Sequence, residues 1–319
     1  MPELRRDPIT GNWRVIGGKI RKRPNSQKDD CIFCSGKEHL LPPEICSLRG
    51  SNGFRVRAVP EKHPVLEVTQ LRSQGIGLYD QMNNKGADEL LIEEGHGVRF
   101  VERSIAEIAI ILQMYRTRII DLYRDKGIRY VAVFREEIAQ NSQHPLSRIL
   151  GMSRLPDRMT KKIDYTRKHF RQKQRCTWCD ILRQELNEGK RMVAERNHAV
   201  ALVPYAPRFC NEVLILPKTH TASFEEWTHD EDLAELLKEI AQKYQTLENI
   251  TGWGFILYNA PNINTTSQLE DQLNIPSSFH FHLEMIPSME ISVAEIGLGL
   301  YSVPFLPEQI AKQLREIKC

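Results

Sequence analysis

Long apolar runs are missing from this sequence. No window reaches about 18 uninterrupted apolar residues, the length that a membrane-spanning helix needs. The opening segment, MPELRRDPITG, carries basic residues, but no apolar segment of a signal peptide follows them. We therefore expect a protein that neither spans a membrane nor is secreted, and we place it in the cytoplasm.

A strong excess of charge of either sign is also missing. The chain has 44 Lys and Arg against 41 Asp and Glu, which gives a formal net charge of +3, and 41% of its residues are hydrophobic. This balance is typical of a globular protein and argues against disorder. Because 319 residues exceed what one small core needs, we expect two domains or a duplicated unit.

Cysteines are few, and their spacing does not favour a disulfide framework in a reducing compartment. Four of the seven form two C-x-x-C pairs with the same internal spacing, Cys31-Ile-Phe-Cys34 and Cys176-Thr-Trp-Cys179. The other three, Cys46, Cys210 and Cys319, stand alone. Two identical pairs indicate an internal repeat.

The same order of elements follows each pair, as a repeat requires. Each half is predicted to contain strands, a histidine, a helix that opens with a capping box, a further strand and a terminal histidine. In the first half these are strands 54–59 and 89–93, His96, the Ser104 and Glu107 box, strand 129–134 and His144. In the second half they are strands 199–204 and 212–217, His220, the Thr228 and Glu231 box, strand 253–258 and His280.

Each Cys pair and the two histidines of its half have the composition of a zinc site. The predicted ligand sets are Cys31, Cys34, His96 and His144, and Cys176, Cys179, His220 and His280. A single C-x-x-C also fits a redox pair, but the repeated order favours two zinc ions per chain. Four protein ligands close a zinc site, which makes these sites structural rather than catalytic.

The segment between the halves is strongly basic. Residues 153–175 carry nine Lys or Arg against two Asp, a pattern that also occurs in nucleic-acid-binding proteins. No aromatic platform or nucleic-acid motif accompanies it, which argues against nucleic acid as a partner. A solvated connector helix is the better interpretation.

Several further motifs point to a known family. The segments RRDPITGNWRVI, CIFC, GLYD, ELLIEEGH, CTWCDILRQEL, LVPYAPRF, ILPKTH and FHFHLEMIP resemble the galactose-1-phosphate uridylyltransferases and their nucleotidylyltransferase relatives in the histidine triad superfamily. The resemblance implies an α+β fold of two histidine-triad-like halves, residues 1–150 and 176–319, which form a pseudo-dimer around an antiparallel sheet and are joined by a connector at 151–175.

The same resemblance implies an activity. Relatives transfer a nucleoside monophosphate from a sugar nucleotide to a sugar phosphate through a covalent nucleotidyl-histidine. They are often dimers, which makes a homodimer one candidate, although the sequence does not specify the oligomeric state. Imidazole suits this role because it attacks phosphorus at neutral pH and leaves readily. The resemblance also makes Arg23 and Asn259 the expected substrate contacts.

The family's nucleophile is absent from the first half. It would be the second His of a His-Pro-His-x-Gln run, but this chain has Leu146 there, after His144 and Pro145. The predicted loop 135–143 carries Glu136 and Glu137 and lacks the family's glycines, so it would repel a phosphate. His63 is the one reactive-looking residue left in this half, and an exposed loop histidine is the simpler interpretation.

The second half keeps the histidine pattern. His280, His282 and Glu284 alternate along a predicted strand and should share one face. We predict that His282, the repeat equivalent of Leu146, is the nucleophile and that Glu284 orients its ring. An inert or metal-binding His282 is the alternative. The loop 260–278 contacts a phosphate or sugar, or is a flexible insertion.

Two functions therefore stay open. The first is a nucleotidylyltransferase or phosphorylase-type enzyme that acts on a sugar nucleotide and a sugar phosphate. The second is a catalytically degenerate, zinc-stabilised protein that binds a nucleotide or a sugar phosphate. The sequence does not specify the nucleotide base or the sugar.

Overall fold

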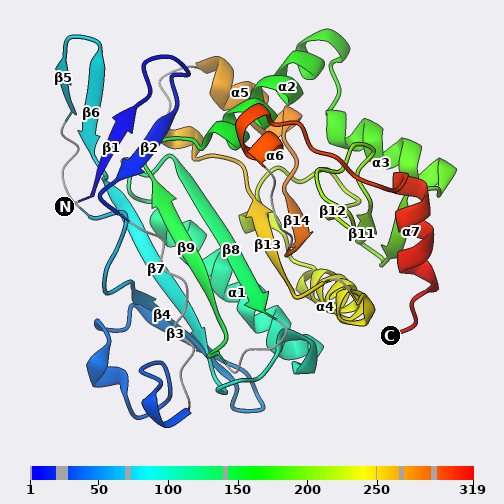
Figure 1. The fold of residues 1–319 in the computed structure, drawn as a ribbon, viewed down its shortest axis with the longest axis horizontal. Coiled ribbons are helices and arrows are strands. Elements are labelled where there is room, and N and C mark those ends of the chain that lie inside the picture. Colours follow the sequence, from blue (N-terminus) through cyan, green and yellow to red (C-terminus); the bar gives the residue numbers. More distant parts are fainter. Residues whose placement is uncertain are drawn as a thin grey trace.

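One antiparallel sheet runs through both halves of the chain (Figure 1). The computed structural model describes residues 2–18, 28–68, 73–138, 143–248, 250–265, 269–288 and 293–319. Within them the sheet has ten strands in the order β10-β11-β12-β14-β13-β8-β9-β7-β4-β3. Their bounds, in that order, are Met192–Glu195, Ala199–Leu202, Val213–Pro217, His282–Pro287, Gly252–Tyr258, Tyr130–Ile138, Leu146–Met152, Gly86–Glu93, Arg55–Pro60 and Cys46–Arg49.

The two halves meet in the middle of this sheet. Strand β8 of the first half pairs with β13 of the second over six residue pairs, from Gly252 opposite Ile138 to Leu257 opposite Val133. Gly252 and Gly254 allow the two strand backbones to approach closely, because a Cβ atom on either glycine would lie 2.6 Å from a backbone oxygen of β8. The pseudo-dimer that the resemblance implies therefore has one continuous sheet.

Two long helices cover one face of the sheet. Helix α1 (Ile105–Leu122) and helix α4 (Asp230–Thr246) contact each other and share the main apolar core with alternate residues of the strands. Leu91 and Val133 from the first half and Ile215 and Leu283 from the second belong to this core and are fully buried. Their neighbours along the strands pack on the opposite face, as Leu90 and Ile92 do on either side of Leu91, so the residues alternate between two packed faces.

Only one of the two predicted capping boxes forms. Ser104 caps α1, with its hydroxyl accepting from the Glu107 backbone N–H. The box at Thr228 is a wrong prediction, because α4 begins one residue later, with His229 as its N-cap and no side-chain cap. The His229 ring stacks on that of His198, with 3.5 Å between the ring centroids. The three acidic residues of the first turn interact favourably with the positive end of the helix dipole.

Strand β8 is also longer than predicted. It continues to Ile138, four residues beyond the predicted end, so Glu136 and Glu137 lie in a strand rather than in a loop. Glu137 pairs with Arg135 and accepts from the backbone N–H of Phe100. Ion pairs with Glu93 and Glu137 satisfy the buried Arg135 in this extension, whereas Glu136 is exposed.

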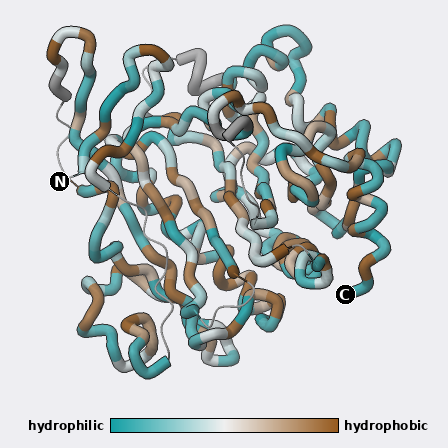
Figure 2. The backbone as a smooth tube through the Cα atoms, viewed as in Figure 1, coloured by the Kyte–Doolittle hydropathy of each residue, from teal (hydrophilic) through white to brown (hydrophobic). Residues whose placement is uncertain are grey.

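Two further helices cover the other face of the sheet. Helices α2 (Asp157–Lys173) and α3 (Thr177–Glu188) pack on it through small apolar clusters. Figure 2 shows that α2 is mostly hydrophilic. The shorter elements are α5 (Leu269–Ser278), α6 (Val293–Leu298) and α7 (Pro307–Glu316), the 3-10 turns Lys28–Asp30, Glu38–Leu40, Phe100–Glu102, Phe224–Glu226 and Ile263–Thr265, and a second sheet of β2 (Trp13–Ile16), β1 (Glu3–Arg6), β6 (Tyr79–Asn83) and β5 (Ser73–Ile76).

Helix α2 occupies most of the predicted connector segment. It follows directly on β9 and leads into α3, and its buried side chains are Met159, Ile163 and Thr166. One side of this helix is thus packed against the sheet, which differs from a connector that is solvated all round. Among the described residues, none of the helices is both long and apolar enough to cross a bilayer.

Candidate metal centres and active site

The first Cys2His2 set comes together from three separate loops. The ligand atoms of Cys31, Cys34, His96 and His144 all lie within 4.8 Å of one another. The Cys34 Sγ atom is 3.5 Å from Nδ1 of His96 and 3.7 Å from Nδ1 of His144. His96 follows β7 and His144 precedes β9, and these two strands are paired.

The second set has the same arrangement. The ligand atoms of Cys176, Cys179, His220 and His280 lie within 4.8 Å of one another, with Cys179 Sγ at 3.4 Å from Nδ1 of His220 and 3.9 Å from Nδ1 of His280. A hydrogen bond from the Cys176 thiol holds the pKa of Cys179 well below its usual value. A thiolate in the first turn of α3 also benefits from the helix dipole.

The hydrogen bonds behind these imidazoles fit a metal. The Nε2 atom of His144 lies 2.8 Å from the Glu93 carbonyl. The Nε2 atom of His220 lies 2.8 Å from the Pro276 carbonyl, and that of His280 lies 3.1 Å from the Pro217 carbonyl. A carbonyl only accepts, so Nε2 carries the proton and the Nδ1 lone pair faces the sulfur atoms. Carbonyl partners of this kind are usual for metal-bound histidines. Burial also lowers the pKa of His144 to about 4, which keeps that ring neutral.

Leu146 lies in an apolar cluster on the sheet face opposite α1. It is 5% exposed and belongs to one cluster with Val59, Leu90 and Ile92. Two residues further along β9, Arg148 forms a buried ion pair with Asp88. The position that the resemblance assigns to the family's nucleophile is thus an ordinary packed core position in this half.

His282 is held firmly at the equivalent position of the second half. It is fully buried at the start of β14, and its Nδ1 lies 2.9 Å from the His280 carbonyl. Its ring centroid is 4.3 Å from that of Trp178 and 5.0 Å from that of Tyr258. Burial and the nearby Lys162 ammonium hold the pKa of His282 well below its usual value. The Nδ1 hydrogen bond places the proton there and leaves the lone pair on Nε2.

Glu284 shares the face of His282, as predicted, but the two side chains are bridged by a lysine, Lys162, that contacts both. The Lys162 Nζ atom lies 2.5 Å from His282 Nε2 and 2.7 Å from Glu284 Oε1. Sequence reasoning assigned Glu284 to orient the ring directly, whereas in the structure the His280 carbonyl fixes the tautomer and Glu284 holds Lys162. The difference arises because α2 lies over this strand.

Two arginines complete this cluster. Arg158 of α2 and Arg208 of the loop before β12 both contact Glu284, at 3.1 and 2.5 Å. Burial alone would raise the pKa of Glu284, but Lys162, Arg208 and Arg158 hold it well below its usual value. Sequence reasoning missed all three cations, although Arg158 and Lys162 stand at the i and i+4 spacing that aligns two side chains on one helix face.

The remaining predicted residues lie elsewhere. Asn259 is fully buried, where its Oδ1 accepts from the Phe224 N–H and its Nδ2 donates to Glu225, at 2.7 Å each. His63 is exposed and lines a cavity of about 500 Å³ with Lys62 and Glu67. Arg23, and the middle of the 135–143 and 260–278 segments, lie outside the described residues.

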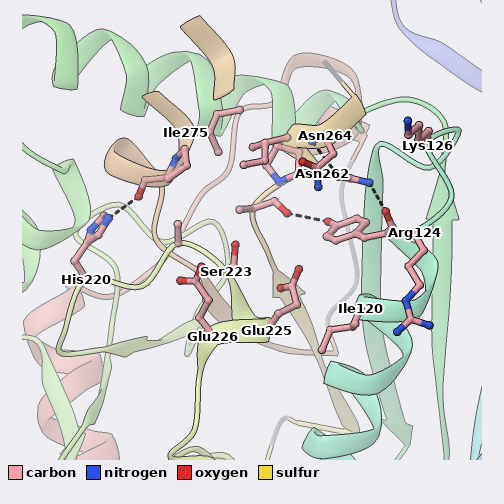
Figure 3. A pocket seen from close by; sticks show the side chains of 16 residues that line it. Ile120, Arg124, Lys126, His220, Ser223, Glu225, Glu226, Asn262, Asn264 and Ile275 are labelled. Atoms are coloured by element: carbon pink, nitrogen blue, oxygen red, sulfur yellow. Dashed lines mark hydrogen bonds between the residues drawn. The ribbon is translucent and has the colours of Figure 1, made fainter. Parts of the chain in front are cut away.

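A larger cavity of about 820 Å³ opens beside the second Cys2His2 set (Figure 3). Its wall includes His220, Glu225 and Glu226 on one side and Arg124 and Asn262, near the end of α1, on the other. Burial raises the pKa of Glu225. His282 and Lys162 are not part of this wall, so the cavity and the charged cluster are separate features.

Comparison with known proteins confirms the resemblance and the fold class. Residues 161–318 match the family model described as "Galactose-1-phosphate uridyl transferase, C-terminal domain". Over 99% of the chain, the sequence is 26% identical to ADP-glucose phosphorylase from Arabidopsis thaliana, over 93% of that protein, and 27% identical to galactose-1-phosphate uridylyltransferase from Thermotoga maritima, over 98% of it.

Solved structures agree with these relatives. An ADP-glucose phosphorylase from Arabidopsis thaliana with bound ADP-glucose superposes over all of both chains with a TM-score of 0.76 and 25% identity. A uridylyltransferase structure superposes over 98% of this chain and 97% of its own, with a TM-score of 0.81 and 21% identity. The second comparison concerns the fold alone.

Proposed function

We propose that this chain is a galactose-1-phosphate uridylyltransferase-like protein and that it transfers a nucleoside monophosphate between sugar phosphates through a covalent histidine intermediate. Relatives that cover nearly the whole chain are uridylyltransferases and an ADP-glucose phosphorylase. Their identities to this chain are almost equal, so both uridine and adenine sugar nucleotides are substrates to test.

We propose His282 as the nucleophile. The observation that carries this assignment is the hydrogen bond from His282 Nδ1 to the His280 carbonyl. It leaves the Nε2 lone pair facing the Lys162 ammonium rather than the metal ligands. Leu146, at the equivalent position of the first half, has no lone pair and is packed in an apolar cluster. Arg23 stays in the proposal as a substrate contact.

The two transfer steps are balanced displacements at phosphorus. The Nε2 lone pair forms an N–P bond to the α-phosphorus of the sugar nucleotide, and the bridging P–O bond breaks. The sugar phosphate leaves with that electron pair. In the second step an oxygen of the acceptor phosphate attacks the same phosphorus, and the N–P electrons return to Nε2. The histidine divides one difficult displacement into two easier ones.

We propose zinc as the metal of both Cys2His2 sets, because two thiolates and two imidazoles are a usual zinc ligand set. A bound zinc ion would link the loop or helix that carries the Cys pair to the ends of two paired strands. In the second half that link fixes His280, and the His280 carbonyl in turn orients His282. The metal therefore acts on the proposed active site only through structure.

The test is the intact mass of the protein after incubation with UDP-glucose or ADP-glucose. We expect a mass increase of one nucleoside monophosphate with at least one of them. His282→Asn should abolish the adduct while two zinc ions stay bound. His63→Asn is the matched control, since His63 is an exposed loop residue, and it should form the adduct normally. An adduct that survives in His282→Asn and disappears in His63→Asn would contradict the assignment.

One observation favours the second candidate function, a nucleotide- or sugar-phosphate-binding protein without turnover. His282 is fully buried, and Lys162 contacts the nitrogen that would attack. A binding protein would retain a nucleotide without forming a covalent bond. Calorimetric binding of UDP-glucose or ADP-glucose, together with an unchanged protein mass, would support that function.

We also propose a cytoplasmic homodimer. All seven cysteines lie in described segments and none forms a disulfide, which fits a reducing compartment. Several large apolar side chains near the C-terminus are exposed, and clustered exposed apolar residues are common at protein interfaces; they are Leu298, Leu300, Phe305 and Leu306. Light scattering of the purified protein measures the oligomeric state directly, and a monomer at micromolar concentration would contradict the dimer.

A further inference from the structure

A buried ammonium group occupies the approach to the proposed nucleophile. The Nδ1 edge of His282 faces the His280 carbonyl, and the ring is covered by Trp178 and Tyr258. The Nε2 edge faces Lys162 Nζ. The side chain of Lys162 is 13% exposed, so this ammonium is largely withdrawn from water. A phosphorus atom that reaches Nε2 must take the place that Lys162 Nζ occupies.

The charges around this position are not balanced. Lys162, Arg158 and Arg208 contribute three cations, whereas Glu284 and Glu212, which pairs with Arg208, contribute two carboxylates. Both carboxylates are almost fully buried, at 4% and 3% exposed. Buried charge is costly unless it is paired. Lys162 and Arg208 are largely buried, whereas Arg158 is 44% exposed, so the one positive charge in excess lies on a side of the cluster that an anion from solvent can reach.

We propose that Lys162 binds the non-bridging oxygens of the phosphoryl group that His282 attacks, and that the same ammonium covers Nε2 when no substrate is bound. This inference rests on the proposed function and adds a residue to it. Lys162 lies in helix α2, so the connector between the two halves would supply the phosphate-binding cation of the second half.

The surroundings of Lys162 allow both positions. Its ammonium lies 3.9 Å from the centroid of the Tyr258 ring and 5.4 Å from that of Trp178. The attraction between a cation and an aromatic ring offsets part of the hydration that the ammonium loses on burial. Glu284 accepts one of its three N–H bonds. A lysine side chain is flexible and its donors can turn, so a short movement carries the ammonium from Nε2 to a phosphoryl oxygen.

The balance of the reaction is unchanged by this movement. Lys162 keeps its proton throughout, and its positive charge faces the negative charge that develops on the phosphoryl oxygens as the N–P bond forms and the P–O bond breaks. Glu284 touches neither the phosphorus nor Nε2 in this scheme. It is a positioning residue that holds Lys162 on the side of Nε2.

Lys162→Met tests the inference, because it keeps the length of the side chain and removes the charge. Lys161→Met is the matched control, since Lys161 is the exposed neighbour on α2. With UDP-glucose or ADP-glucose, we expect the nucleotidyl adduct to form at least about 100-fold more slowly in Lys162→Met, and Lys161→Met to behave as the wild type. Lys162→Arg should recover part of the rate. Adduct formation in Lys162→Met at the wild-type rate or faster would overturn the inference.

A second measurement separates this inference from the proposed function. Binding of uridine and adenosine 5′-monophosphate is measured by calorimetry in His282→Asn, with and without Lys162→Met. Lys162→Met should weaken the binding of whichever nucleotide binds by about tenfold or more, as for a charge-assisted contact. If the wild type forms no adduct at all, the proposed function fails, and the binding data still decide about Lys162. Equal affinity in the two variants, or no binding to either, would overturn the inference.

Discussion

Leu146→His places a histidine where the resemblance to the uridylyltransferases predicts a nucleophile, and we expect it to destabilise the protein without creating an enzyme. Leu146 is 5% exposed and belongs to the apolar cluster with Val59, Leu90 and Ile92. By analogy with His282, the new Nδ1 can donate to the carbonyl of His144. The new Nε2 would face apolar side chains.

The expected magnitude follows from these contacts. A fully buried leucine contributes about 1.5–3 kcal/mol, and a buried polar atom without a partner costs about 1–3 kcal/mol. The free energy of unfolding should therefore fall by roughly 2.5–6 kcal/mol. Leu146→Met keeps the volume and the apolar character, and should cost less than about 1.5 kcal/mol.

The assay is urea unfolding of the two variants and the wild type, followed by turnover of UDP-glucose or ADP-glucose with a hexose-1-phosphate. The first half offers no counterpart to the Lys162 and Glu284 pair among its described contacts, because Arg148 is bound to Asp88 there. In the double variant that combines His282→Asn with Leu146→His, the introduced histidine is the one that is tested, and we expect no turnover. Turnover of that double variant near 1 per second, which is common for enzymes, or a Leu146→His variant as stable as the wild type, would refute this reasoning.

Three further predictions concern other parts of the molecule. Cys31→Ser and Cys176→Ser should each release one of two zinc ions and cost several kcal/mol of stability, because a structural metal contributes to folding; Cys210→Ser should do neither, and elemental analysis that finds no zinc in wild-type protein prepared without chelator would contradict both. Burial lowers the pKa of Lys162 from 10.5 to about 8 in the folded protein, so the unfolded chain binds more protons between these values and stability should rise by roughly 2–3 kcal/mol from pH 7 to pH 10. Urea unfolding at both pH values should show that Lys162→Met lacks this rise, and an equal rise in both proteins would contradict it. Asn259→Ala should cost roughly 1–3 kcal/mol because it leaves the buried N–H of Phe224 without its acceptor; a higher KM for the sugar nucleotide at unchanged stability would instead support the substrate contact expected from the sequence.

Much of the fold is predictable from short-range pattern. The strands follow from alternating residues, and the two ligand sets follow from the repeat, because the same order of elements twice leaves each C-x-x-C pair with two histidines from its own half. The structure brings both sets within 4.8 Å. The resemblance to one family added the antiparallel arrangement of the two halves.

Contacts between distant segments were not predictable in the same way. The end of β8 was missed because Glu136 and Glu137 interrupt the apolar pattern, and partners such as Arg135 and the Phe100 N–H satisfy Glu137 only in the folded chain. Lys162 was counted with the solvated basic residues of the connector. Nothing in the order of residues shows that α2 turns this side chain toward a strand 120 positions away in the sequence.

The nucleotidyl-histidine itself is the most direct test of the central claim. The wild-type protein is incubated with UDP-glucose or ADP-glucose, digested under conditions that preserve N–P bonds, and its peptides are analysed by mass spectrometry. The account predicts one nucleoside monophosphate on the peptide that contains His282. A nucleotidyl group on any other residue, or unmodified protein with both sugar nucleotides, would contradict it.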